Sequence, residues 1–125
     1  MADITPPVSS ESQVIQGYGD GGFCIAGHDF DGSVIVTAQE TSAWSARSVE
    51  DIDPKQLIST LSRAAELNIL LLGTGKSIEP LEPGLRIMLR EQGIGLDVMD
   101  TGAACRTFNV LLAEGRSVAA ALIGT

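Results

Sequence analysis

A group of chemically versatile side chains follows a strand-like apolar run near the carboxyl end of the chain. Asp100 and Thr101 come first, and Cys105, Arg106 and Asn109 follow on a predicted helix. Packing alone requires no carboxylate, thiol, guanidinium or amide at such close spacing. Small α/β domains place their sites where a strand ends and a helix begins. We therefore predict a ligand- or partner-binding surface at this corner.

Arg106 has two possible roles on this helix. A helical projection places Phe108 and Leu111 on the core face and Arg106 almost opposite them. Arg106 is then either a solvated charge or one half of an interaction, with Asp100 as a candidate partner. In the purely structural alternative, Asp100 or Thr101 caps the helix and Arg106 pairs locally.

Cys105 decides whether nucleophilic chemistry is available. It lies early in the helix, where the helix dipole lowers the pKa of an open thiol, but a buried structural thiol is the commoner state. His28 is the chain's single histidine, and nothing in the sequence brings it beside this helix. Without a base, catalysis is hard to build, so an enzyme is disfavoured. One His and two distant Cys make no ordinary zinc site, and we expect neither metal nor cofactor.

A second corner is predicted at Gly73, Thr74 and Gly75, after a buried apolar strand. Residues 73–77 end like a Walker A loop, but Leu70 stands where that motif needs a glycine. The backbone amides either line a small anion site or form a plain tight turn. Because carboxyl ends of parallel strands share one edge of a sheet, we expect this corner beside Thr101.

The hydrophobic pattern predicts a β-rich first half followed by alternating helices and strands. Residues 17–22 carry the letters of a dinucleotide motif, but a strand follows instead of a helix, which favours a glycine-rich turn. Asp53 and Pro54 mark the start of the first helix. The predicted strands are 13–18, 23–26, 33–37, 43–46 (anchored by Trp44), 69–72, 96–99 and 118–123, and the predicted helices are 54–65, 83–93 and 103–114. This order demands a parallel or mixed sheet covered by helices, with the N-terminal strands extending it or packing on it as a hairpin layer.

Length and charge limit the class of protein. The 125 residues suffice for one domain, predicted at 13–125 after a disordered tail at 1–12. A net charge of −8 disfavours nucleic-acid backbones and anionic membrane surfaces. We expect no transmembrane segment and no signal peptide, and two reduced cysteines in the cytoplasm.

Three segments resemble one family: IQGYGDGGF at 15–23, LLLGTGKS at 70–77 and VMDTGAACRTFNVLLAEGRSVAAALI at 98–123. That family groups small prokaryotic proteins of unknown function with a mitochondrial assembly factor for respiratory complex I, the NADH:ubiquinone oxidoreductase. The resemblance implies a single three-layer α/β domain with a central mixed, mostly parallel sheet and an N-terminal β-rich layer. The family's motif positions match both predicted corners, and none has a proven catalytic role.

The resemblance implies a non-enzymatic assembly or protein-interaction module that assists biogenesis of a membrane-associated respiratory complex. Its partners would be subunits of that complex or another assembly factor, and the oligomeric state stays open. The alternative is a small-molecule or anion-binding protein, or a minor enzyme, that uses a pocket between residues 73–75 and 100–109.

Overall fold

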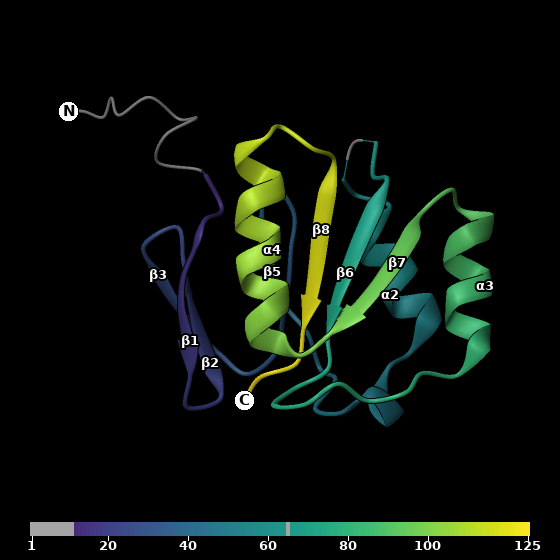
Figure 1. Ribbon diagram of the computed structural model, residues 1–125, viewed down its shortest axis with the longest axis horizontal. Helices are drawn as coiled ribbons and strands as arrows, with labels where there is room; N and C mark the ends of the chain where they lie inside the picture. Colours follow the sequence, from purple (N-terminus) through teal and green to yellow (C-terminus); the bar gives the residue numbers. More distant parts are fainter. Residues whose placement is uncertain (1–11, 65) are drawn as a thin grey trace.

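The computed structural model describes residues 12–64 and 66–125 (Figure 1). The predicted tail at 1–12 therefore lies outside the described residues, apart from Ser12. The strands are β1 (Ile15–Gly19), β2 (Gly22–Ile25), β3 (His28–Asp31), β4 (Val34–Val36), β5 (Thr41–Ala43), β6 (Ile69–Gly73), β7 (Gly95–Met99) and β8 (Val118–Leu122). The helices are the short 3₁₀ turn η1 (Val49–Asp51), α2 (Pro54–Leu61), α3 (Pro83–Glu91) and α4 (Thr101–Ala113).

Five strands form the main sheet in the order β5-β4-β8-β6-β7. Strand β6 pairs in parallel with β7 and β8, whereas β4 pairs antiparallel with β8 and β5. The sheet is mixed, as predicted, but it is not mostly parallel. Helices α3 and α4 connect β6, β7 and β8 and keep them parallel, while the tight turn between β4 and β5 makes that pair antiparallel.

Strands β1, β2 and β3 form a separate antiparallel sheet. The N-terminal strands were predicted either to extend the main sheet or to form a separate layer, and the structure shows both arrangements. Strands β1, β2 and β3 form the separate layer, and β4 and β5 extend the main sheet. Strand β3 was not predicted. Its sequence, HDFD, is largely exposed and lacks an apolar run, so only its pairing with β2 makes it a strand.

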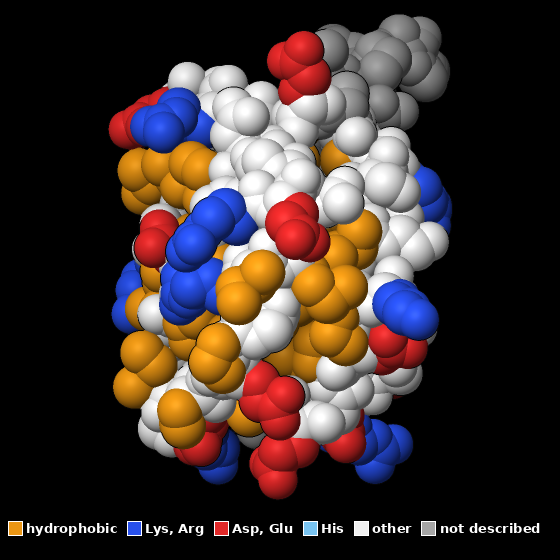
Figure 2. All heavy atoms as spheres, turned by 90° about the vertical axis from the view of Figure 1, so that its right-hand side faces the viewer, with side chains coloured by type: hydrophobic (Ala, Val, Ile, Leu, Met, Phe, Trp, Pro, Cys, Tyr) orange, Lys and Arg blue, Asp and Glu red, His pale blue; other side chains and the backbone are white. Residues whose placement is uncertain are grey.

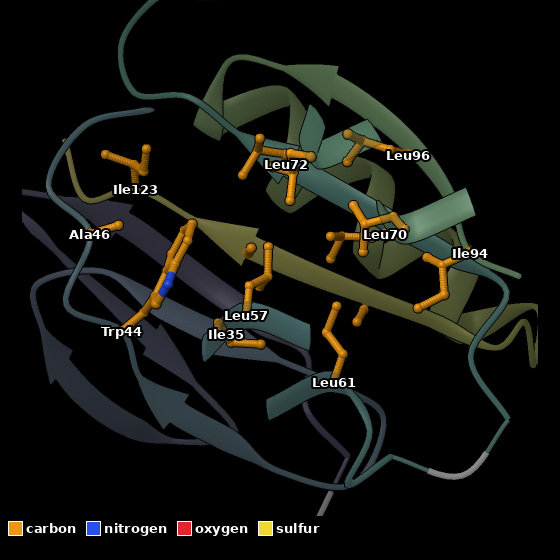
Figure 3. Packing of buried hydrophobic residues seen from close by; sticks show 14 residues of the cluster. Ile35, Trp44, Ala46, Leu57, Leu61, Leu70, Leu72, Ile94, Leu96 and Ile123 are labelled. Atoms are coloured by element: carbon orange, nitrogen blue, oxygen red, sulfur yellow. The ribbon is translucent and has the colours of Figure 1, made fainter. Parts of the chain in front are cut away.

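The main sheet is covered on both faces, as predicted for its apolar strands. Helices α2 and α3 cover one face, and α4 with the small sheet covers the other (Figure 1). Leu70 and Leu72 of β6 belong to the first core, which includes Trp44 and is drawn in Figure 3. Leu71 belongs to the second core, which contains Phe108 of α4.

Several element boundaries differ from the prediction. Trp44 is buried but follows β5, which ends at Ala43. Asp53 caps α2 as predicted, accepting hydrogen bonds from the two amides at 55 and 56. Helix α2 ends at Leu61, because the amides of residues 63 and 64 bond three residues back in a tighter turn. Helix α4 begins at Thr101, two residues earlier than expected.

Candidate functional site

The two predicted corners lie side by side, as expected for neighbouring parallel strands. Thr101 is the connection between them. Its backbone N–H donates to the Gly75 carbonyl at 2.8 Å, and its Oγ1 accepts from the Gly75 N–H at 2.9 Å. The same hydroxyl donates to the Ile123 carbonyl at 2.8 Å. Thr101 is fully buried and joins the ends of β6, β7 and β8.

Gly73 and Thr74 complete this contact. A Cβ on Gly73 would lie 2.8 Å from the Cα of Thr101, so only glycine allows the two segments to meet. Thr74 Oγ1 donates to the Ser77 carbonyl at 2.7 Å and accepts from the Glu79 N–H at 3.1 Å. The two corners touch directly, and a small-molecule site between them stays a prediction.

The loop after β6 does not have the geometry of a phosphate cradle. In a Walker A motif the helix begins within the glycine-rich loop, so that its free N–H groups face the phosphate. Here α3 begins only at Pro83, well beyond Gly75. The other glycine-rich run, at 17–22, joins β1 to β2 and is followed by a strand, as predicted.

Asp100 caps α4, which was the structural alternative for this residue. Its Oδ1 accepts from the Ala103 N–H at 2.9 Å. Cys105 points into the core and is 2% exposed. Burial raises the pKa of the Cys105 thiol to about 12, Arg106 acts weakly against this shift, and Asp100 adds to it. Cys105 is therefore protonated at neutral pH and is no nucleophile.

Asn109 binds the backbone of β1. Its Oδ1 accepts from the Ile15 N–H at 2.8 Å, and its Nδ2 donates to the Ile15 carbonyl at 2.9 Å. The amide thus serves Ile15 as a neighbouring strand would, on the side of β1 that faces away from β2. The sequence could not reveal this partner, because Ile15 lies 94 positions away in the chain.

Arg106 reaches the small sheet and not Asp100. Its Nη1 donates to the phenol oxygen of Tyr18 at 3.0 Å. Within the described residues it forms no ion pair with Asp100, whose carboxylate already caps the helix. The Tyr18 ring also lies against Gly102, where a Cβ would come within 2.6 Å of the phenol oxygen. Tyr18 was missed from sequence, and its one signal was an aromatic residue inside a glycine-rich turn.

The accessible part of the corner is therefore small. Tyr18 is 44% exposed and Arg106 is exposed beside it, whereas the glycines, Thr101 and Cys105 are buried. A guanidinium and a phenol can bind a carboxylate or a carbonyl, but they form no acid–base pair. His28 lies on β3, the strand of the small sheet farthest in order from β1. No group of three or more His, Cys, Asp or Glu in the described part could hold a metal ion.

Comparison with known proteins places the chain in a family. Residues 15–123 match the family model described as a protein of unknown function (DUF498/DUF598). The chain belongs to the DUF498/DUF598 family. It is 36% identical to an uncharacterised protein of Rhodobacter capsulatus over 87% of this chain and 82% of that protein.

Other relatives of this chain carry a functional name. The chain is 36% identical to NADH dehydrogenase (ubiquinone) 1 alpha subcomplex assembly factor 3 of Xenopus tropicalis, over 92% of this chain and 63% of that protein. The human protein of the same name is 31% identical, over 92% of this chain and 62% of its own length. The match thus spans less than two thirds of these relatives.

Solved structures of other proteins share the fold. An outer membrane protein of Bartonella henselae has a TM-score of 0.82 at 36% identity, covering 92% of this chain and 97% of its own. A Mth938-like domain of Bordetella pertussis has a TM-score of 0.77 at 25% identity, covering 98% and 91% of the two chains. In the described part of this chain, no helix is both long and apolar enough to cross a membrane.

Proposed function

We propose that this protein is a non-catalytic protein-interaction module that assists biogenesis of a membrane-associated respiratory complex, the NADH:ubiquinone oxidoreductase. The observation that carries the proposal is its likeness to proteins named as assembly factors for that enzyme, over most of this chain. We place it in the cytoplasm, with subunits of the complex or a second assembly factor as its partners.

The chemistry of the corner supports a binding role over catalysis. Hydrogen bonds to backbone groups of the fold occupy the side chains of Thr101, Asp100 and Asn109. The Cys105 thiol is buried and protonated. Arg106 and Tyr18 remain at the surface, and a guanidinium desolvated in an interface is a common anchor of binding energy. We propose that Arg106 contacts a partner protein.

Deletion of the gene in the source organism tests the proposal. Membranes of the deletion strain should contain less assembled complex on native gels and oxidise NADH with ubiquinone more slowly, and the wild-type gene should restore both. Arg106→Ala should restore them less well than Arg116→Ala, a matched control at an exposed arginine beyond α4. Normal assembly in the deletion strain would refute the assembly role.

Purified protein provides a second test. Because both glycine-rich runs lack the geometry of a nucleotide site, calorimetry should detect no micromolar binding of ATP or NADH. Binding of either nucleotide at that affinity would favour a ligand-binding or enzymatic function.

A further inference from the structure

Among the residues that the structure describes, no strand pairs with the outer edge of β7 in the main sheet. Strand β7 is the last strand in the order β5-β4-β8-β6-β7. The Gly95 N–H donates to the Asn68 carbonyl, and the Met99 carbonyl accepts from the Thr74 N–H, so residues 95, 97 and 99 face β6. By the alternation of a strand, the backbone groups of Leu96 and Val98 point away from the sheet.

Arg86 of α3 occupies part of this edge. Its Nη1 donates to the outward carbonyl of Leu96 at 2.9 Å. Proteins protect free sheet edges with charged side chains, because bare edges pair with other strands. The arginine side chain can move away from this edge. A carboxylate that binds the Arg86 guanidinium would free the Leu96 carbonyl to accept a backbone N–H.

A groove runs along the same edge. One hollow of about 600 Å³ is lined by Ile78, Ile87 and Val98 among others, and a second of about 460 Å³ lies beside Gly95 and Leu96. The two hollows share Arg86 and Arg90. Ile78 and Ile87 are 64% and 50% exposed. Figure 2, which faces this side of the molecule, shows apolar side chains gathered around basic ones.

The two hollows differ in the acidic residues that line them. Arg86 and Arg90 lie one helical turn apart, and in the described part neither forms an ion pair. The 460 Å³ hollow has no acidic lining residue, whereas Glu79 and Glu82 line the other. Within the described residues these two arginines have no acidic partner, so in a chain of net charge −8 they make a local site for a carboxylate.

We propose that the β7 edge and this groove, which we call the α3–β7 groove, receive an extended segment of a partner protein. The segment adds a strand to β7 through the backbone of Leu96 and Val98. It places an apolar side chain between Ile78 and Ile87 and a carboxylate on the guanidinium groups of Arg86 and Arg90, which releases the Leu96 carbonyl. This inference rests on the proposed function only for the partner's identity as an assembly partner.

A second copy of the chain fits the groove less well. In the antiparallel register that pairs Leu96 with Val98, Asp97 would face Asp97 of the other copy. Like charges directly opposite in a sheet are destabilising. Each copy also carries a net charge of −8, so the two repel as they approach.

The probe for the test is a library of short random peptides displayed on phage, selected on the immobilised full chain. Enriched peptides should alternate apolar residues and carry an acidic residue at one end. A fluorescent synthetic copy of an enriched peptide should then slow hydrogen exchange at the amides of Leu96 and Val98. Failure to enrich any peptide, or protection confined to other amides, overturns the proposal.

Matched variants test whether binding depends on the groove residues or on the overall charge and apolar surface of the protein. Arg90→Glu and Ile87→Glu should each weaken binding of the synthetic peptide about tenfold or more. Arg47→Glu reverses another exposed arginine that forms no ion pair with any described residue. Val110→Glu changes an apolar residue that is 57% exposed on α4. These controls should bind normally, and equal weakening by a control overturns the assignment.

Sedimentation of the wild-type protein and the Arg90→Glu variant tests the other occupant. A dimer that Arg90→Glu dissociates would assign the groove to a second copy and overturn our proposal, whereas a monomer supports it.

The deletion strain distinguishes failure of the groove proposal from failure of the assembly proposal. If wild type restores assembly of the complex and Arg90→Glu restores it equally, the groove fails as a partner site while the assembly role stands. If the deletion has no effect but the peptide binds in the groove, the assembly role fails and the groove stands.

Discussion

Asn109 offers the sharpest test of how the small sheet is held, and we predict that Asn109→Ala destabilises the protein strongly. In the wild type, the two polar atoms of this side chain bind both backbone groups of Ile15. Alanine keeps the helical backbone of α4 but removes both bonds. The N–H and carbonyl of Ile15 then face a gap on the side of β1 opposite β2.

The magnitude follows from those two bonds. Losing each bond costs about 1 kcal/mol where water replaces it, and about 1–3 kcal/mol where the partner stays buried and unsatisfied. Because the site is only partly buried, water can reach the exposed groups and reduce the second cost. We expect a total loss of roughly 2–4 kcal/mol in the free energy of unfolding. For a chain of this size, that corresponds to a melting temperature lower by roughly 10 °C.

Urea denaturation and thermal melting followed by circular dichroism measure this loss. Thr107→Ala is the control, because Thr107 is half-buried on the same helix and makes no side-chain hydrogen bond in the described structure. It should change stability by less than about 0.5 kcal/mol. Amide exchange at Ile15 should accelerate in Asn109→Ala. If Asn109→Ala is as stable as Thr107→Ala, the bonds to Ile15 do not hold β1 and the reasoning is wrong.

Three further outcomes follow from the site. Arg106→Ala should lower the free energy of unfolding by at most about 1 kcal/mol, because the hydrogen bond from Arg106 to the Tyr18 phenol is exposed. Phe108→Ala leaves a cavity at a fully buried position and should lower it by about 3–5 kcal/mol. Equal melting curves for the two variants would make Arg106 structural. The pKa of the Cys105 thiol is about 12 in the folded protein and near 9.0 in the unfolded chain, so the free energy of unfolding should fall as pH rises from 9.0 to about 12. Below that range this thiol should contribute no pH dependence. The check is the denaturant midpoint of wild type and Cys105→Ala across that range, which should decline less in the variant. Gly73→Ala should cost about 1–3 kcal/mol or more, because its Cβ would meet the backbone of Thr101, and an unchanged denaturant midpoint would show that the two corners are not closely packed.

The order of strands and helices was largely readable from the sequence. Apolar runs such as residues 69–72 must be buried on two faces, and a helix start such as Asp53 with Pro54 is a local event. Strand β3 was not predicted, because its largely exposed residues carry no apolar pattern. The share of parallel pairing was overestimated, because the direction of β4 depends on its partner β8 and not on its own residues.

The residues alone indicated that polar groups follow β6 and β7 and that these ends meet, because a helix connects these two consecutive strands and makes them parallel neighbours. What each group does there depends on contacts with segments distant in the chain. Thr101 and Asn109 bond backbone groups distant in the chain, and Cys105 packs in the second core. Arg106 stays at the surface beside Tyr18. The unpaired edge of β7 is likewise a property of strand order, and strand order arises from long-range packing that no local pattern encodes.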